Sequence, residues 1–237
     1  MYRTILRSLV LLVCLLSAGM FGVSSQAQDY THPRRMGLPE TGFERPDPEN
    51  HQMNLKNNLI AYIAEEHEAS LVTVTAFIRG GTASDETDGA AEALARALRR
   101  GPKSATSGMF VEKLNDMVAQ YRVIVSQEMM EITFNVPAEH MGDALHLMAG
   151  VLREPNINAE DIEALRAAAG REKRYGSGLG GARSLFEDII LGDHIYGRTP
   201  VAEKVSRLAM TDVETFHKVF FIPRNVVLSL SGDFVAE

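Results

Sequence analysis

Residues 77–100 read FIRGGTASDETDGAAEALARALRR, and they predict a strand, a glycine turn and a helix in immediate succession. The strand begins at Ser70, is rich in β-branched residues and stops at Gly80-Gly81. Asp88 is the expected cap of a helix over Gly89–Arg100, because a cap residue accepts hydrogen bonds from the first helical amides. The apolar residues of this helix share one face, which predicts that this face is buried: Ala91, Leu94, Ala95 and Leu98.

The remaining segments extend this pattern to an α+β fold. Further strands are expected over 59–64, in two segments before Pro137 and over 225–231. In the second of the two segments, apolar residues alternate with polar ones, as in a half-buried antiparallel strand: Met130, Ile132, Phe134 and Val136. Helices are expected over 109–120, 138–153, 159–174, 184–191, 201–208 and 211–220, and the glycine-rich stretch 176–181 is interpreted as a mobile connection. Because strands and helices are grouped along the chain, the expected class is α+β, a mainly antiparallel sheet with helices packed on one face.

Composition and charge exclude several classes of function. The chain has 237 residues, of which 45% are hydrophobic and 23% charged, as is typical of a globular protein. The single cysteine, Cys14, excludes a disulfide scaffold, a zinc finger and an iron–sulfur cluster, since each needs several thiolates. The formal net charge of −7 argues against non-specific nucleic-acid binding, which needs a basic surface.

The first 27 residues have the organisation of a secretory signal peptide. Two arginines precede an apolar run over 9–23, small residues follow it, and the segment contains no Asp or Glu. The alternative is a transmembrane anchor, for which the run is short. Cleavage would also remove Cys14 and leave a periplasmic or secreted protein. The polar, proline-dotted residues 28–53 are expected to form an extended lead-in to a domain over 54–237.

Three stretches of the chain together carry a family resemblance. They are Phe77–Glu86 with Gly89-Ala90-Ala91; Val136-Pro137 with the Leu152–Pro155 step; and His194–Arg198 with Thr211-Asp212-Val213, Phe216-His217, Phe221–Asn225 and Gly232-Asp233-Phe234. In this order and at these distances they resemble the N-terminal half-unit of the pitrilysin/insulinase family. The members of that family are inverted-motif zinc peptidases related to the mitochondrial processing peptidase. The resemblance covers residues 54–237.

The resemblance implies a zinc site whose motif does not match in this chain. The family carries His-x-x-Glu-His on the helix after the first glycine turn, where the histidines bind zinc and the glutamate acts as base. Aligned on Gly89-Ala90-Ala91, these positions are Glu92, Ala95 and Arg96, and the family's third ligand corresponds to Glu172. Arginine stays protonated and alanine has no basic group. No catalytic residue, metal ligand or cofactor is therefore expected.

The vestigial positions leave two interpretations open. Arg96 follows Glu92 by one helical turn, and Glu172 follows Leu165 by seven residues, on the expected inward side of its helix. One hypothesis is that Arg96 replaces zinc as the local positive charge between the two carboxylates. The alternative is that Glu92 and Arg96 form an ordinary exposed ion pair, which contributes only about 0–1 kcal/mol.

A second departure concerns substrate binding. The resemblance implies an edge strand that presents an Asn-Ala pair to the backbone of a bound peptide. Aligned back from Val136-Pro137, these degenerate positions are Arg122 and Val123. The strand is expected to persist, but the asparagine is absent, which weakens the case for peptide binding there.

The expected function is therefore that of a secreted, non-catalytic homologue of a zinc metallopeptidase. Active members resemble two half-units that close around a peptide, so the expected role is a partner or peptide-binding subunit of an active member. Because relatives continue beyond Gly232-Asp233-Phe234, the domain is interpreted as truncated, with apolar surface for a second half-unit to cover. Two alternatives stay open: an active zinc endopeptidase, with zinc as cofactor, and a fragment of a longer two-half peptidase. No nucleic-acid partner is expected, and no membrane contact after removal of the signal.

Overall fold

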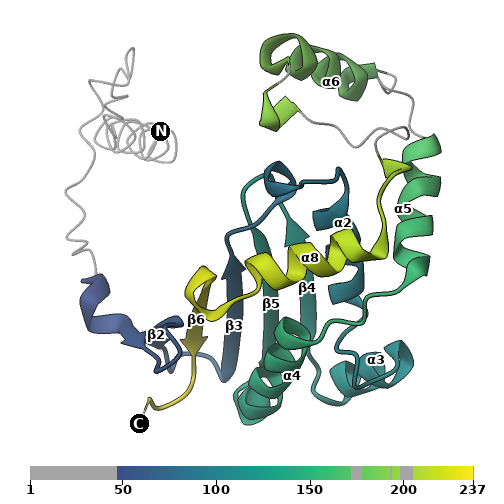
Figure 1. The fold of residues 1–237 in the computed structure, drawn as a ribbon. Helices are drawn as coiled ribbons and strands as arrows, with labels where there is room; N and C mark the ends of the chain where they lie inside the picture. The colour runs from purple at the N-terminus through teal and green to yellow at the C-terminus, as the bar shows by residue number, and fades with distance from the viewer. Residues whose placement is uncertain (1–46, 172–177, 193, 198–204, 237) are drawn as a thin grey trace, which may run out of the picture. The chain divides into compact units, whose positions relative to one another are not determined.

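A six-stranded sheet lies at the centre of the structure, with the strand order β1-β2-β6-β3-β5-β4 (Figure 1). The strands are β1 (Gln52–Asn54), β2 (Ile60–Glu65), β3 (Leu71–Ile78), β4 (Gln120–Val125), β5 (Met130–Pro137) and β6 (Val226–Gly232). Strands β2 and β6 run parallel, and every other neighbouring pair is antiparallel. The mainly antiparallel sheet predicted from the sequence is thus confirmed.

This computed structural model describes residues 47–171, 178–192, 194–197 and 205–236. Three expected features lie outside the described residues: the signal peptide over 1–27, the first half of the helix over 201–208, and Glu172. The expected lead-in is described only from residue 47, where it forms the 3-10 turn η2 (Pro48–His51) and then β1. In the described part of the chain, no helix combines the length and apolar character needed to cross a membrane.

One face of the sheet is buried and the other is half exposed. Along β5, Met130, Ile132, Phe134 and Val136 have no exposed surface, whereas the residues between them are partly exposed. In the strand β3, Val72, Val74, Ala76 and Ile78 are likewise fully buried, and Thr75 on the opposite face is buried as well. The alternation along β5 is the one predicted from the sequence, and it requires cover on one face only.

The helices are α2 (Ala90–Arg99), α3 (Ser107–Asp116), α4 (Met141–Arg153), α5 (Ala159–Arg171), α6 (Gly178–Leu191) and α8 (Met210–Phe220). Those that pack on the buried face cover it, whereas α6 mainly contacts the 3-10 turn Ile195–Gly197 that follows it. Helix α4 contacts β3 and β5, while α2 contacts β4, α5 and α8. Helix α2 therefore occupies the middle of the helical layer, and its residues Leu94 and Leu98 are fully buried in the core.

The predicted cap of α2, Asp88, is wrong by one residue. The N-cap residue is Gly89, with φ of 98°, and Asp85 supplies the bonds that were expected from Asp88. Its Oδ2 accepts the N–H of Gly89 at 2.8 Å, and its Oδ1 accepts the N–H of Ala91 at 2.8 Å. The left-handed conformation of Gly89 turns the chain so that a carboxylate four residues earlier reaches the helix start.

Two further boundaries differ from the prediction. Helix α3 covers 107–116 and not 109–120, because Val118 adopts a positive φ of 50° and β4 already begins at residue 120. Helix α6 starts at Gly178, so residues 178–181 of the glycine stretch 176–181 are helical and not a connection. Glycine lowers helix propensity by only about 1 kcal/mol per residue relative to alanine, so a longer helix can include it.

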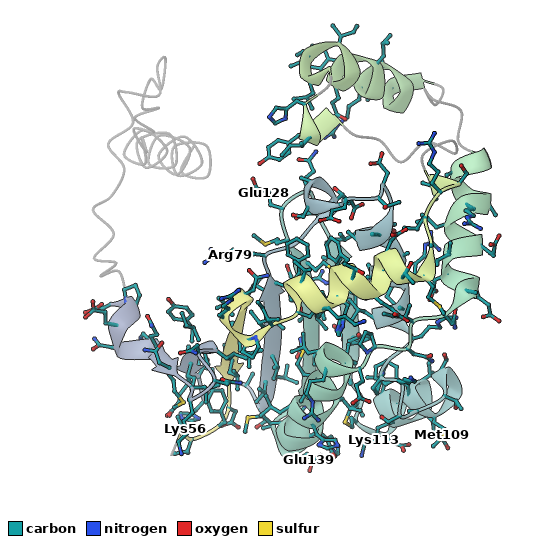
Figure 2. All side chains as sticks on the ribbon, in the orientation of Figure 1. Lys56, Arg79, Met109, Lys113, Glu128 and Glu139 are labelled. Atoms are coloured by element: carbon teal, nitrogen blue, oxygen red, sulfur yellow. The ribbon has the colours of Figure 1, made fainter. Side chains whose placement is uncertain are left out.

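The 3-10 turn η5 (Ile195–Gly197) after α6 is bonded to the turn between β4 and β5. The Nε2 of Gln127 donates to the carbonyl of Tyr196 at 2.9 Å, and the Tyr196 hydroxyl donates to the carboxylate of Glu128, labelled in Figure 2. These bonds join a segment from the second half of the chain to the end of the sheet.

Candidate functional site

Helix α2 carries the three motif positions Glu92, Ala95 and Arg96. Ala95 has no exposed surface and belongs to the hydrophobic core. Glu92 and Arg96 are each partly exposed. The position at which the family would hold its catalytic base is thus filled by apolar packing, with no polar atom directed at a substrate.

Arg96 is electrostatically coupled to helix α5. Its charge helps to stabilise the carboxylate of Asp161, near the start of α5. Its Nε atom is buried and has no hydrogen-bond partner within the part of the chain that the structure describes. Among the described side chains, no ion pair joins Arg96 to Glu92. The hypothesis that Arg96 sits between Glu92 and Glu172 stays a prediction, since Glu172 is not described.

One turn after Arg96, Arg100 joins α2 to α5 directly. Its Nη2 forms an ion pair with Asp161 Oδ2, and its Nη1 lies 3.3 Å from Glu160 Oε2. The Asp161 side chain is only 10% exposed, whereas that of Glu160 is 86% exposed. Burial raises the pKa of Asp161 above its ordinary value. The positive charges of Arg100 and, less strongly, Arg96 oppose that rise. The pair with Asp161 is therefore the stronger link.

A sequence pattern outside the family motif indicates this link between α2 and α5. Arg96 and Arg100 are spaced i,i+4, which puts both cations on one helix face, and two acidic residues open the predicted helix from 159. What the sequence could not provide is the pairing of the two helices, because they are about sixty residues apart.

Apolar contact reinforces the same helix pair. An added Cβ at Gly89 would lie 3.1 Å from Cδ2 of Leu165, which is itself 5% exposed. A side chain at this position would have to push Leu165 away by a few tenths of an ångström, so glycine favours the close approach of α5 to the start of α2.

The residues of α2 do not fit a zinc ion of the kind the motif would hold. Ala95 offers no donor atom, and the guanidinium of Arg96 has no lone pair to give. Across the described residues, no three His, Cys, Asp or Glu side chains gather closely enough to hold a metal ion. The chemistry that this part of α2 supports is ion pairing between helices.

The substrate-edge positions lie on β4, which ends the sheet. Arg122 is exposed, with Nη2 3.4 Å from Oε1 of Glu131 on the neighbouring strand. Val123 is 5% exposed and joins the core. The edge strand expected from the sequence is present.

The comparisons with known proteins agree with this architecture. The family model described as Insulinase (Peptidase family M16) matches residues 60–175, about half of the chain. The chain therefore belongs to the insulinase family of peptidases. A comparison with curated proteins finds no match.

Solved structures show which part of the family fold is present. A peptidase M16 inactive domain from Pseudomonas fluorescens has a TM-score of 0.70 at 17% identity, over 78% of this chain and 46% of that one. A protease from Helicobacter pylori has a TM-score of 0.69 at 18% identity, over 78% and 46%. The first half of the periplasmic protease PqqL from Escherichia coli has a TM-score of 0.67 at 16% identity, over 78% and 42%. This chain spans less than half the length of each, and its fold is that of an M16 half-unit.

Proposed function

We propose that this chain is a secreted, non-catalytic member of the insulinase family that serves as a subunit beside a second half-unit of an active peptidase. The observation that carries the proposal is the set of residues at the motif positions of α2. A fully buried alanine stands where the base would be, and an arginine stands where a zinc-binding histidine would be.

Helices α2 and α5 are held together by side-chain contacts that need no metal. In a zinc peptidase of this family, the ion would link the motif helix to a later helix through its ligands. Here Arg100 and Asp161 link α2 to α5, and Leu165 packs against Gly89 at the start of α2. A half-unit held together in this way keeps its shape as an interaction partner without the catalytic site.

Helix α6 supplies a surface that a second half-unit could cover. Five large apolar side chains of this helix are exposed: Leu179, Leu185, Phe186, Ile189 and Ile190. At 100° per residue they fall within an arc of about 140°, so they form one stripe. Exposed apolar stripes of this kind are typical of interaction surfaces. The ion pair between Arg183 and Glu187 lies beside the stripe, on the polar side.

The similar structures support the partner and the compartment. Each solved chain is more than twice as long as the part that this chain matches, one is named as an inactive domain and another as half of a periplasmic protease. A second half-unit of the same fold is therefore the proposed partner, and the periplasm is the proposed compartment.

The test is the association state of the purified secreted chain, measured by size-exclusion chromatography with light scattering. The proposal predicts self-association when the chain is alone, and a one-to-one complex with an active family member that has an intact His-x-x-Glu-His motif. Phe186→Asp should weaken both, whereas Arg183→Ala, on the polar side of α6, should not. A stable monomer that does not bind the active member would contradict the proposal.

A further inference from the structure

The outer edge of β4 has backbone groups that point away from the sheet. Antiparallel strands exchange hydrogen bonds at alternate residue pairs. The N–H of Ser126 donates to the carbonyl of Met129 at 2.9 Å, and the register pairs Val123 with Ile132. Counting back from Ser126, Ile124 and Arg122 face β5, and Val123 turns its N–H and C=O outward.

Arg99 already binds that outward carbonyl. Its Nε lies 3.3 Å and its Nη2 3.1 Å from the carbonyl oxygen of Val123, so two donors converge on one acceptor. A bond from a charged donor to a carbonyl is stronger than a bond between neutral groups. The side chain comes from the last turn of α2 and reaches around the edge of the strand.

Helix α2 is held in place for this contact. The hydroxyl of Tyr121 donates to the carbonyl of Leu98 at 2.7 Å, one residue before Arg99. Burial raises the pKa of Tyr121 far above its ordinary value, so the hydroxyl stays protonated and remains a donor. The ring of Tyr121 also packs edge-on against Phe110, with centroids 5.1 Å apart. Arg99 therefore starts from a fixed point beside β4.

We infer that Arg99 closes the outer edge of β4 to strand addition. An extended peptide that pairs with this edge must accept from the N–H and donate to the C=O of Val123. The C=O is occupied by a guanidinium that the peptide would have to displace, and positive charge at a strand edge also opposes pairing. This inference concerns the backbone edge and not the motif on α2, so it stands whether or not a partner half-unit binds α6.

The test measures strand addition directly. The probe is a fluorescently labelled synthetic peptide with the sequence of residues 130–137, which already pairs with β4 along its inner edge. Its binding to the full chain is followed by fluorescence anisotropy for the native protein, Arg99→Ala and the control Arg183→Ala, which removes one positive charge from a remote exposed site. Protection of the Val123 amide against hydrogen exchange reports where the peptide sits.

Arg99→Ala should bind the peptide about tenfold more tightly than the native chain, with new protection at Val123, and Arg183→Ala should behave like the native chain; tenfold equals about 1.4 kcal/mol. If Arg99→Ala does not fold, Arg99→Lys is used instead, since it keeps the aliphatic stem and one donor group. Its affinity for the peptide should exceed that of the native chain by less than tenfold. Equal affinity of the native chain and the folded Arg99 variant, whether tight or undetectable, would overturn the inference.

Discussion

Replacing Arg100 by methionine tests how α2 and α5 are held together. The substitution keeps an apolar stem but removes the cation that pairs with Asp161, whose side chain is only 10% exposed. A buried carboxylate left without its partner costs about 3–5 kcal/mol, whereas loss of the contact to the exposed Glu160 costs about 0–1 kcal/mol. Arg96 stays near Asp161 and offsets part of this loss, so we expect a decrease of about 3 kcal/mol in the free energy of unfolding.

The assay is urea unfolding followed by circular dichroism at pH 7, with Arg100→Met/Asp161→Leu as the matched control. The double variant should recover to within about 1 kcal/mol of the native chain, because removal of both partners leaves neither charge of this pair without its counterion. Since burial raises the pKa of Asp161 in the folded state, that group destabilises the fold less as the pH falls, and the deficit of Arg100→Met should shrink toward pH 4. A loss below about 1 kcal/mol at pH 7, or a deficit that grows on acidification, would show that the Arg100–Asp161 pair does not hold α2 to α5.

Two further predictions concern neighbouring elements. Gly89→Ala should destabilise the fold by more than about 1 kcal/mol in thermal unfolding, because φ is 98° and the new Cβ would lie 3.1 Å from Leu165. The control is Gly142→Ala in α4, where a Cβ meets nothing within 4 Å, and it should stabilise the fold by about 0.4–1 kcal/mol. Equal effects of the two would contradict the packing described for α2 and α5. Burial lowers the pKa of His217, whose Nε2 is 2.9 Å from the carbonyl oxygen of Leu152, so the neutral ring is favoured and its contribution should be lost as the pH falls below about 6.5. Stability measured from pH 8 to 5 should fall less steeply in His217→Gln, which retains a donor without titrating, and an unchanged slope would count against this role.

The sequence predicted best where local pattern and burial coincide. The alternation in β5 and the apolar face of α2 each follow from a side-chain period, and the structure confirms both. The parallel pairing of β2 with β6 could not be predicted in the same way. It joins Ile60 to Val227 across most of the chain, and β-branched residues favour a strand without specifying its neighbour.

In the candidate site, too, local features could be predicted from the sequence and long-range packing could not. The alignment of Glu92, Ala95 and Arg96 follows from the glycine turn, but the exposure of each residue depends on helices that approach from distant segments. Asp85 replaced Asp88 as the source of the capping bonds because a single left-handed glycine changed the path of the chain. The contact of Arg99 with Val123 likewise depends on the packing of α2 beside β4, which no residue spacing encodes.

We expect this half-unit to have no zinc-dependent peptidase activity of its own. The most direct measurement is the metal content of the purified secreted chain, by inductively coupled plasma mass spectrometry, together with cleavage of a fluorogenic peptide before and after a chelator. We expect zinc far below one ion per chain and no cleavage that the chelator abolishes. One zinc per chain, with cleavage that is abolished by the chelator and restored by added zinc, would contradict it.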